Sequence, residues 1–90
     1  MERTLYVGDV AAAIRDTLAG IYTKAQLGKW AHLAMLADDA KTRLYDPRHW
    51  SDIHAAVHQL IFLAEGPDYE LDDKELRAMM ERLELLAVEQ

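Results

Sequence analysis

The residues of this sequence best placed to do chemistry together are two histidines, His54 and His58. On a helix, side chains four positions apart lie one above the other, so two imidazoles at this spacing can share a metal ion. The zinc-protease helix motif needs a glutamate directly after the first histidine, and Ala55 stands there instead. A third ligand would have to come from His49, Asp52 or another helix. Histidines at the boundary of a buried helix face, without metal, are the simpler interpretation, and we predict no metal and no cofactor. A module switched by metal or by these histidines is the alternative.

Acidic side chains dominate the stretch Pro-Asp-Tyr-Glu-Leu-Asp-Asp-Lys-Glu at residues 67–75, with five acids against one lysine. Part of this acidity starts a helix. Asp72 fits the N-cap and Glu75 the N3 position of a capping box, and the helix dipole favours negative charge in the first turn. Capping does not explain the acids upstream of residue 71. A surface that attracts a basic partner is the alternative explanation for them.

Signatures of catalysis are missing elsewhere in the chain. Ser51 is the single serine and has no Gly-x-Ser-x-Gly context. The four glycines are scattered, so they form no phosphate-binding loop. The chain has no cysteine, which excludes disulfides, thiol catalysis and thiolate metal sites. We therefore predict that the protein is not an enzyme.

The charge balance sets the class of partner. The 90 residues include 16 acidic and 10 basic ones, for a formal charge of −6. This argues against direct nucleic-acid binding, whose footprint is a basic face, and suits either simple solubility or an acidic surface that meets a cationic protein. No apolar run approaches the roughly 20 residues of a membrane span, and the first residues do not resemble a secretory signal. We expect no membrane contact and a cytoplasmic location.

Helices must position these residues, and the first is predicted over about residues 9–19, where apolar residues recur at three- and four-residue steps. Asp9 fits its N-cap, and Gly20 fits the left-handed residue that commonly follows a helix. Residues 5–7 either join this helix or precede it as an extended arm.

The second helix is predicted from residue 24 to about residue 42. Thr23 and Gln26 match a capping box, in which each side chain accepts a hydrogen bond from the backbone of the other residue. Trp30 belongs to the apolar stripe of this helix and is predicted to be buried. Gly28 lowers helix stability by about 1 kcal/mol relative to alanine, so we interpret it as room for a close neighbour.

The third helix is predicted to begin at Asp-Pro, residues 46–47, as N-cap and N1, with Ser51 as the alternative cap. Gly-Pro at residues 66–67 ends it. The fourth begins at Asp72 and continues to about residue 86. Short connections between four amphipathic helices favour antiparallel neighbours. We therefore predict an all-α, antiparallel four-helix bundle without strands, a single domain over residues 1–90.

Arginines and aromatic residues mix in residues 43–50, Arg-Leu-Tyr-Asp-Pro-Arg-His-Trp. Tyrosine, tryptophan and arginine are favoured at interaction hot spots. The interpretation we favour is that Leu44 and Trp50 belong to the core and that the arginines pair with nearby acids.

Two segments resemble those of small bacterial immunity proteins that neutralise colicin D-like tRNA-cleaving toxins. They are Leu-Ala-Gly-Ile-Tyr-Thr-Lys-Ala-Gln-Leu at residues 18–27 and Tyr-Glu-Leu-Asp-Asp at residues 69–73. In that family a small-residue turn and a Ser/Thr cap join the first two helices, and a Tyr-Glu-aliphatic-Asp-Asp segment leads into the last. The likeness covers the two ends, about a third of the chain, and does not extend to the middle.

The resemblance implies a non-enzymatic four-helix inhibitor whose acidic side chains cover the basic active-site cleft of a toxin, in the place of the RNA backbone. A nuclease attracts phosphates with lysine and arginine, so an acidic surface competes for the same cations. The partner would be a basic nuclease toxin domain, with no direct contact to nucleic acid. The residues predicted to bind it are Asp68, Tyr69, Glu70, Asp72 and Asp73, with Tyr69 as aromatic anchor.

A small helical structural or adaptor protein is the alternative function. Met79, Met80, Leu85 and Leu86 crowd two sides of the last helix. A helix that is apolar on more than one side must bury the excess, and a second copy of the chain would do so as a homodimer.

Overall fold

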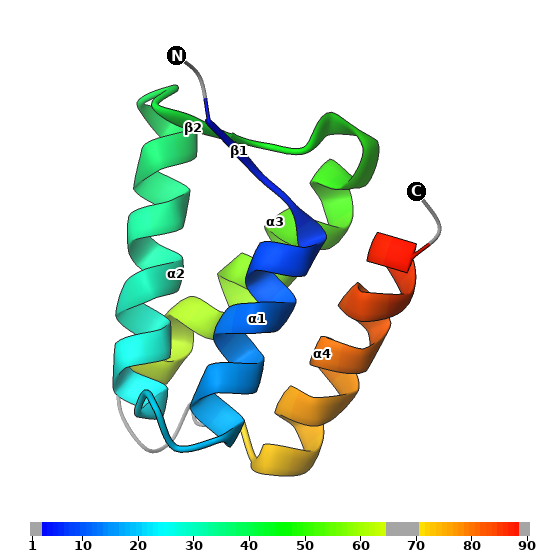
Figure 1. The fold of residues 1–90 in the computed structure, drawn as a ribbon. Helices are drawn as coiled ribbons and strands as arrows, with labels where there is room; N and C mark the ends of the chain where they lie inside the picture. The colour runs from blue at the N-terminus through cyan, green and yellow to red at the C-terminus, as the bar shows by residue number, and fades with distance from the viewer. Residues whose placement is uncertain (1–2, 65–70, 89–90) are drawn as a thin grey trace.

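Four helices make up most of the computed structural model, which describes residues 3–64 and 71–88 (Figure 1). They are α1 (Val7–Leu18), α2 (Lys24–Asp39), α3 (Trp50–Ile61) and α4 (Asp73–Val88). The chain direction alternates from each helix to the next in Figure 1. The predicted all-α, antiparallel four-helix fold is therefore confirmed. None of the helices within these two ranges is long and apolar enough to cross a membrane.

The helices pack chiefly as two pairs around one core, with α1 along α4 and α2 along α3. Burying one aliphatic side chain contributes about 1.5–3 kcal/mol, and the core draws such side chains from all four helices. The largest fully buried ones include Leu5, Ile14, Leu27, Ile53, Leu60 and Leu76. Because α1 and α2 each pack mainly against another helix, a groove is left between them.

Two short strands, which the sequence did not predict, join the segment before α1 to the connection between α2 and α3. β1 (Arg3–Leu5) pairs in parallel with β2 (Arg43–Tyr45), so that Leu5 lies opposite Tyr45. The prediction of a fold without strands was wrong because three-residue strands are too short to show alternation at period two. Antiparallel packing of α1 and α2 brings the start of one helix and the end of the other to the same end of the fold. There the two extended segments meet.

The start of α1 corrects a second prediction. Tyr6 is the N-cap and Asp9 is the N3 residue, whose Oδ2 accepts a hydrogen bond from the Tyr6 N–H at 2.9 Å. The helix thus begins two residues earlier than expected. Of the two alternatives for residues 5–7, Leu5 ends an extended arm and Val7 begins the helix. Gly20 has φ +85°, as its predicted role after the helix requires.

The sequence signals in α2 are confirmed. The Gln26 N–H donates to Thr23 Oγ1 at 3.1 Å, and the Thr23 N–H donates to Gln26 Oε1 at 2.8 Å. A Cβ on Gly28 would lie 2.6 Å from the backbone nitrogen of Ala64, in the 3-10 turn η2 (Phe62–Ala64). Gly28 therefore lets the end of α3 approach α2 closely. The helix ends at Asp39, three residues before the predicted end.

Of the two later helices, α4 follows its predicted cap, whereas α3 begins three residues after the predicted N1 residue, Pro47. Asp46 caps a 3-10 turn, η1 (Pro47–His49), by accepting from the Arg48 N–H at 3.1 Å, and α3 follows at Trp50. Ser51 lies inside α3 and is not its cap. Asp72 Oδ1 accepts from the Glu75 N–H at 2.7 Å, which confirms the capping box at the start of α4.

Candidate functional site

The predicted binding segment is described only in part. Asp68, Tyr69 and Glu70 lie outside the described residues. The Asp72 carboxylate is engaged in its cap, and Asp73 Oδ1 lies 3.3 Å from Lys24 Nζ. The Asp73 side chain is nevertheless mostly exposed. This ion pair joins the start of α4 to the start of α2, so the described part of the acidic segment borders the turn between α1 and α2.

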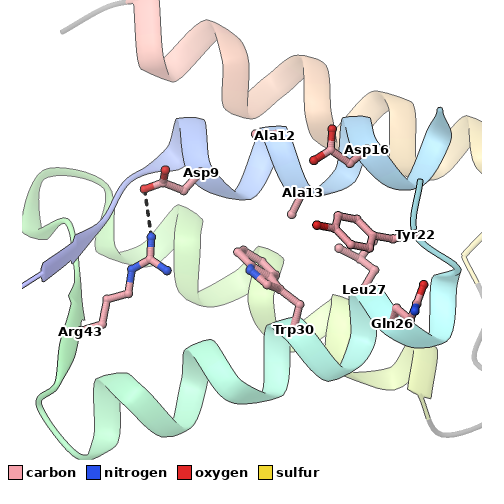
Figure 2. Close-up of a pocket in the computed structure, with 9 residues that line it drawn as sticks. All are labelled: Asp9, Ala12, Ala13, Asp16, Tyr22, Gln26, Leu27, Trp30 and Arg43. Atoms are coloured by element: carbon pink, nitrogen blue, oxygen red, sulfur yellow. Dashed lines mark ion pairs between the residues drawn. The ribbon is translucent and has the colours of Figure 1, made fainter. Parts of the chain in front are cut away.

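A cavity of about 370 Å³ opens beside this turn, between α1 and α2 (Figure 2). We call it the α1–α2 groove. Asp9, Asp16 and two alanines form the α1 wall, and Gln26, Leu27 and Trp30 form the facing α2 wall. The remaining lining residues are Tyr22, from the turn, and Arg43, from β2.

Small side chains on α1 and a large one on α2 give the groove its shape. Ala12 and Ala13 leave the α1 wall shallow, and the Trp30 indole lies across from them (Figure 2). Trp30 packs against the core but is only half-buried, so the prediction that it is buried is confirmed only in part. Tyr22 is 47% exposed. Two aromatic rings are therefore available to a ligand along one surface.

The two carboxylates of the groove differ in their partners. Asp9 accepts from the Tyr6 N–H, and its Oδ2 lies 3.4 Å from Arg43 Nη2. Asp16 makes no side-chain hydrogen bond or ion pair within residues 3–64 and 71–88. The Arg43 Nε is buried and likewise has no hydrogen-bond partner among the described residues. Arg43 therefore neutralises Asp9 inside the groove, whereas Asp16 has no ion-pair partner among the described residues.

The side chains of the groove suit the binding of a cationic group. An unpaired carboxylate beside aromatic rings suits a cationic side chain, which can form an ion pair and a cation–π contact at once. Tryptophan and tyrosine are also the residues most enriched at binding hot spots.

Acids elsewhere are largely taken up by ion pairs inside the protein. Asp46 is buried, and hydrogen bonds from Arg48 hold the pKa of its carboxyl below the usual value. Arg82 Nη2 donates to Asp52 Oδ1 at 3.2 Å, and Arg15 donates to Glu84 at the same distance. The prediction that Arg43 and Arg48 pair with nearby acids is confirmed. Among the described acids, Asp16, Asp39 and Glu81 are those without a side-chain hydrogen bond or ion pair to another described residue.

Trp50 contradicts its prediction as a core residue, because it is 46% exposed. Its ring stacks on His54 with centroids 4.6 Å apart, and His54 lies 4.1 Å from His58. Positions 50, 54 and 58 advance by four residues, so each is rotated by about 40° further from the core face of α3. The helical spacing therefore placed Trp50 at the edge of the core and not within it.

The other residues considered as metal ligands lie apart from this stack. His49 Nδ1 is 4.0 Å from Asp52 Oδ2, and Asp52 is held by Arg82. No three His, Asp or Glu side chains within the described ranges are arranged to hold a metal ion. Sequence analysis also missed Tyr45, which is 97% buried, since its relative exposure is 3%. Only its pairing with β1 places it in the core, and the local pattern carries no signal of that pairing.

Comparison of the chain with protein-family models, with curated proteins and with solved structures finds no match. The fold and the α1–α2 groove therefore carry the functional argument, together with the resemblance in residues 18–27 and 69–73.

Proposed function

We propose that this protein is a non-enzymatic, acidic binding protein that occupies the positively charged cleft of a basic protein partner. The observation that carries the proposal is the α1–α2 groove, where the unpaired carboxylate of Asp16 lies beside the half-exposed rings of Tyr22 and Trp30. The class of partner follows from the resemblance to immunity proteins. It is a nuclease-type bacterial toxin domain, which this protein inhibits.

The charge of the chain supports this partner. Enzymes that cleave RNA gather lysine and arginine to bind phosphates, and a protein with a formal charge of −6 competes for the same cations. Complementary fields also raise the rate of encounter, and this effect weakens as salt is added. An inhibitor that must find a toxin quickly gains from both effects.

The position of the groove supports a continuous binding surface. Tyr22 and Gln26 line the groove at the end where Lys24 pairs with Asp73. The acidic segment that begins α4 therefore borders the groove. A partner that covers the groove would also meet Asp72 and Asp73, the described acids of the segment singled out by sequence.

The test uses the protein encoded immediately upstream as the candidate toxin. Binding of the purified full chain to that protein is measured by calorimetry, and inhibition of RNA cleavage is measured alongside. We expect Asp16→Asn to weaken binding about tenfold, as the loss of one charge-assisted contact implies. Glu81→Gln is the matched control, because Glu81 is exposed on α4 and has no ion pair within the described residues.

Inhibition of cleavage by the wild type, reduced in Asp16→Asn and retained in Glu81→Gln, would support the proposal. Tight binding that leaves RNA cleavage unchanged would contradict the inhibitor function. An equal loss of affinity in both variants would contradict the role of the groove.

A second candidate function, a homodimeric structural or adaptor protein, has its own observation. Leu85 is 67% exposed and Val88 is 81% exposed on α4. Met79, Met80 and Leu86 pack only partly against the core. Sedimentation at micromolar concentration decides it: a strict monomer would rule out the homodimer.

A further inference from the structure

A second cavity, of about 290 Å³, lies at the opposite end of α2 from the Thr23 cap. We call it the Tyr45 cavity. It is formed where the last turns of α2 meet β2 and α3. Its lining residues are Met35, Asp38, Asp39, Tyr45, Trp50, His54 and His58.

The Tyr45 hydroxyl is the feature of this cavity that packing does not explain. The side chain is almost fully buried, yet its oxygen has no hydrogen-bond partner in the described structure. Burial, followed by the charges of Asp38 and Asp39, raises the pKa of this phenol to about 12. The phenol is therefore neutral at physiological pH and lies within the field of two carboxylates. A buried polar group without a partner is costly and calls for an explanation, such as a missing ligand.

The two carboxylates differ in what they already bind. Asp38 Oδ1 accepts from the Tyr45 N–H at 3.2 Å, which leaves its second oxygen for another donor. Asp39 is exposed and makes no side-chain hydrogen bond or ion pair with any described residue. No lysine or arginine lines the cavity, so these charges are not neutralised there by the protein itself.

The opposite wall is a stack of flat rings. Trp50 and His54 lie nearly parallel, with an interplanar angle of 17°, and Tyr45 is tilted against Trp50 at 6.3 Å. The Trp50 side chain is 46% exposed, although its ring is also stacked on His54. Flat cations gain most from such a wall, because they can stack on it while their edges donate hydrogen bonds.

We propose that the Tyr45 cavity binds the guanidinium group of an arginine side chain presented by the basic partner. The guanidinium stacks on Trp50 and donates N–H groups to Asp38, Asp39 and the Tyr45 oxygen. The planar fork of donors matches carboxylates, whereas the ammonium group of lysine is a point charge and does not stack. The inference rests on the proposed function for the source of the arginine, although a free guanidinium compound tests the cavity alone.

The first experiment uses the full chain and Nα-acetyl-arginine methylamide as the probe, with the citrulline analogue as a neutral compound of the same shape. Binding is followed by NMR at the indole N–H of Trp50, and the shift of Trp30 reports separately on binding in the α1–α2 groove. We expect saturable shifts at Trp50 and at least about tenfold weaker binding of the citrulline compound. The absence of saturation, or equal binding of both compounds, would overturn the proposal.

Two variants separate binding from folding. Tyr45→Phe removes only the unpartnered hydroxyl, so we expect it to retain full stability and to bind the arginine compound several-fold more weakly. Asp39→Asn changes an exposed side chain and is expected to weaken the same binding about tenfold. Unchanged affinity in both variants would overturn the proposal.

The affinity of the same two variants for the partner shows whether the partner supplies the guanidinium group. Parallel losses for the arginine compound and for the partner support the proposal. If Asp39→Asn loses the compound but binds the partner normally, the assignment to the partner is overturned. If the wild type does not bind the compound but inhibits the partner, the cavity proposal fails and the proposed function stands.

Discussion

The α1–α2 groove and the Tyr45 cavity lie at different ends of α2 and combine the same materials, aromatic rings and a pair of aspartates. They differ in how the acids are satisfied. In the groove, Arg43 pairs with Asp9 and leaves only Asp16 free. In the Tyr45 cavity, no lysine or arginine lines the wall, and a phenol is buried without a hydrogen-bond partner among the described residues. The protein has thus supplied its own guanidinium to one site and not to the other.

This difference suggests a division of roles. A groove that is half neutralised and open to solvent suits steering and a broad contact, whose energy is spread over several weak interactions. A smaller cavity with unsatisfied polar groups suits a single anchoring side chain. Both depend on the position of α2, because each draws part of its wall from that helix.

The largest effect is expected from moving α2. Gly28→Ala places a Cβ 2.6 Å from the Ala64 nitrogen. Overpacking of about 3 kcal/mol, less about 1 kcal/mol gained in helix propensity, predicts a net loss of about 2 kcal/mol in the free energy of unfolding. Urea denaturation measures it. Gly8→Ala is the matched control in α1, since its Cβ meets nothing within 4 Å and the variant should be no less stable. Equal stability of both variants would show that α2 is not held closely by η2.

The dependence of stability on alkaline pH tests whether the Tyr45 phenol is buried beside acidic groups. The folded-state pKa of Tyr45 is raised from 10.0 to about 12, so the folded protein retains the phenolic proton that the unfolded chain releases. The stability contributed by the neutral phenol is complete below pH 10 and is lost as the pH rises to about 12. We expect the wild type to lose stability relative to Tyr45→Phe across this window. Parallel stability curves for the two proteins would mean that the hydroxyl is not held in a buried, acidic environment.

Substitutions in the acidic segment at residues 68–73 separate capping from binding. Asp72→Ala should lower the free energy of unfolding by about 1 kcal/mol, the usual contribution of an N-cap. The double change Asp68→Asn with Glu70→Gln should leave unfolding unchanged and slow association with the partner. Thermal denaturation and stopped-flow kinetics measure the two quantities. If the double variant binds the confirmed partner at the wild-type rate, residues 68–70 do not attract it.

The smallest effect is expected at Arg43. Because Arg43 neutralises Asp9 inside the groove, Arg43→Gln makes the groove more acidic and should speed association about two- to threefold at low salt. Exposed ion pairs contribute little to stability, so the melting temperature should change little. A slower association would indicate that the Arg43 guanidinium itself contacts the partner.

Local signals predicted the helices well, because their evidence lies within a few residues. The capping boxes at Thr23 and Asp72 join residues only three positions apart. The close packing at Gly28 depends on the absence of a Cβ, which the residue type itself shows. The predicted N-cap of α1, Asp9, lies three residues after the observed one, Tyr6, because an aspartate suits both the N-cap and the N3 position. Sequence alone does not distinguish the two.

The α1–α2 groove and the Tyr45 cavity could not be predicted from patterns within a few residues. Both contain residues brought in by β2, which pairs with a strand about 40 positions earlier in the chain, as in the pairing of Leu5 with Tyr45. Nothing within residues 43–45 indicates that pairing. The free state of Asp16 and Asp39 also depends on which of the 10 basic residues lie nearby, and this is set by the packing of the helices.

The measurement that tests the central claim most directly is the association rate of the full chain with its basic partner as a function of ionic strength. The screening length falls from about 30 Å at 0.01 M salt to about 10 Å at 0.1 M. The acidic-inhibitor account predicts a rate that falls steeply over this range, and less steeply for Asp16→Asn than for Glu81→Gln. A rate that does not depend on salt would contradict the claim that the acidic surface guides this protein to its partner.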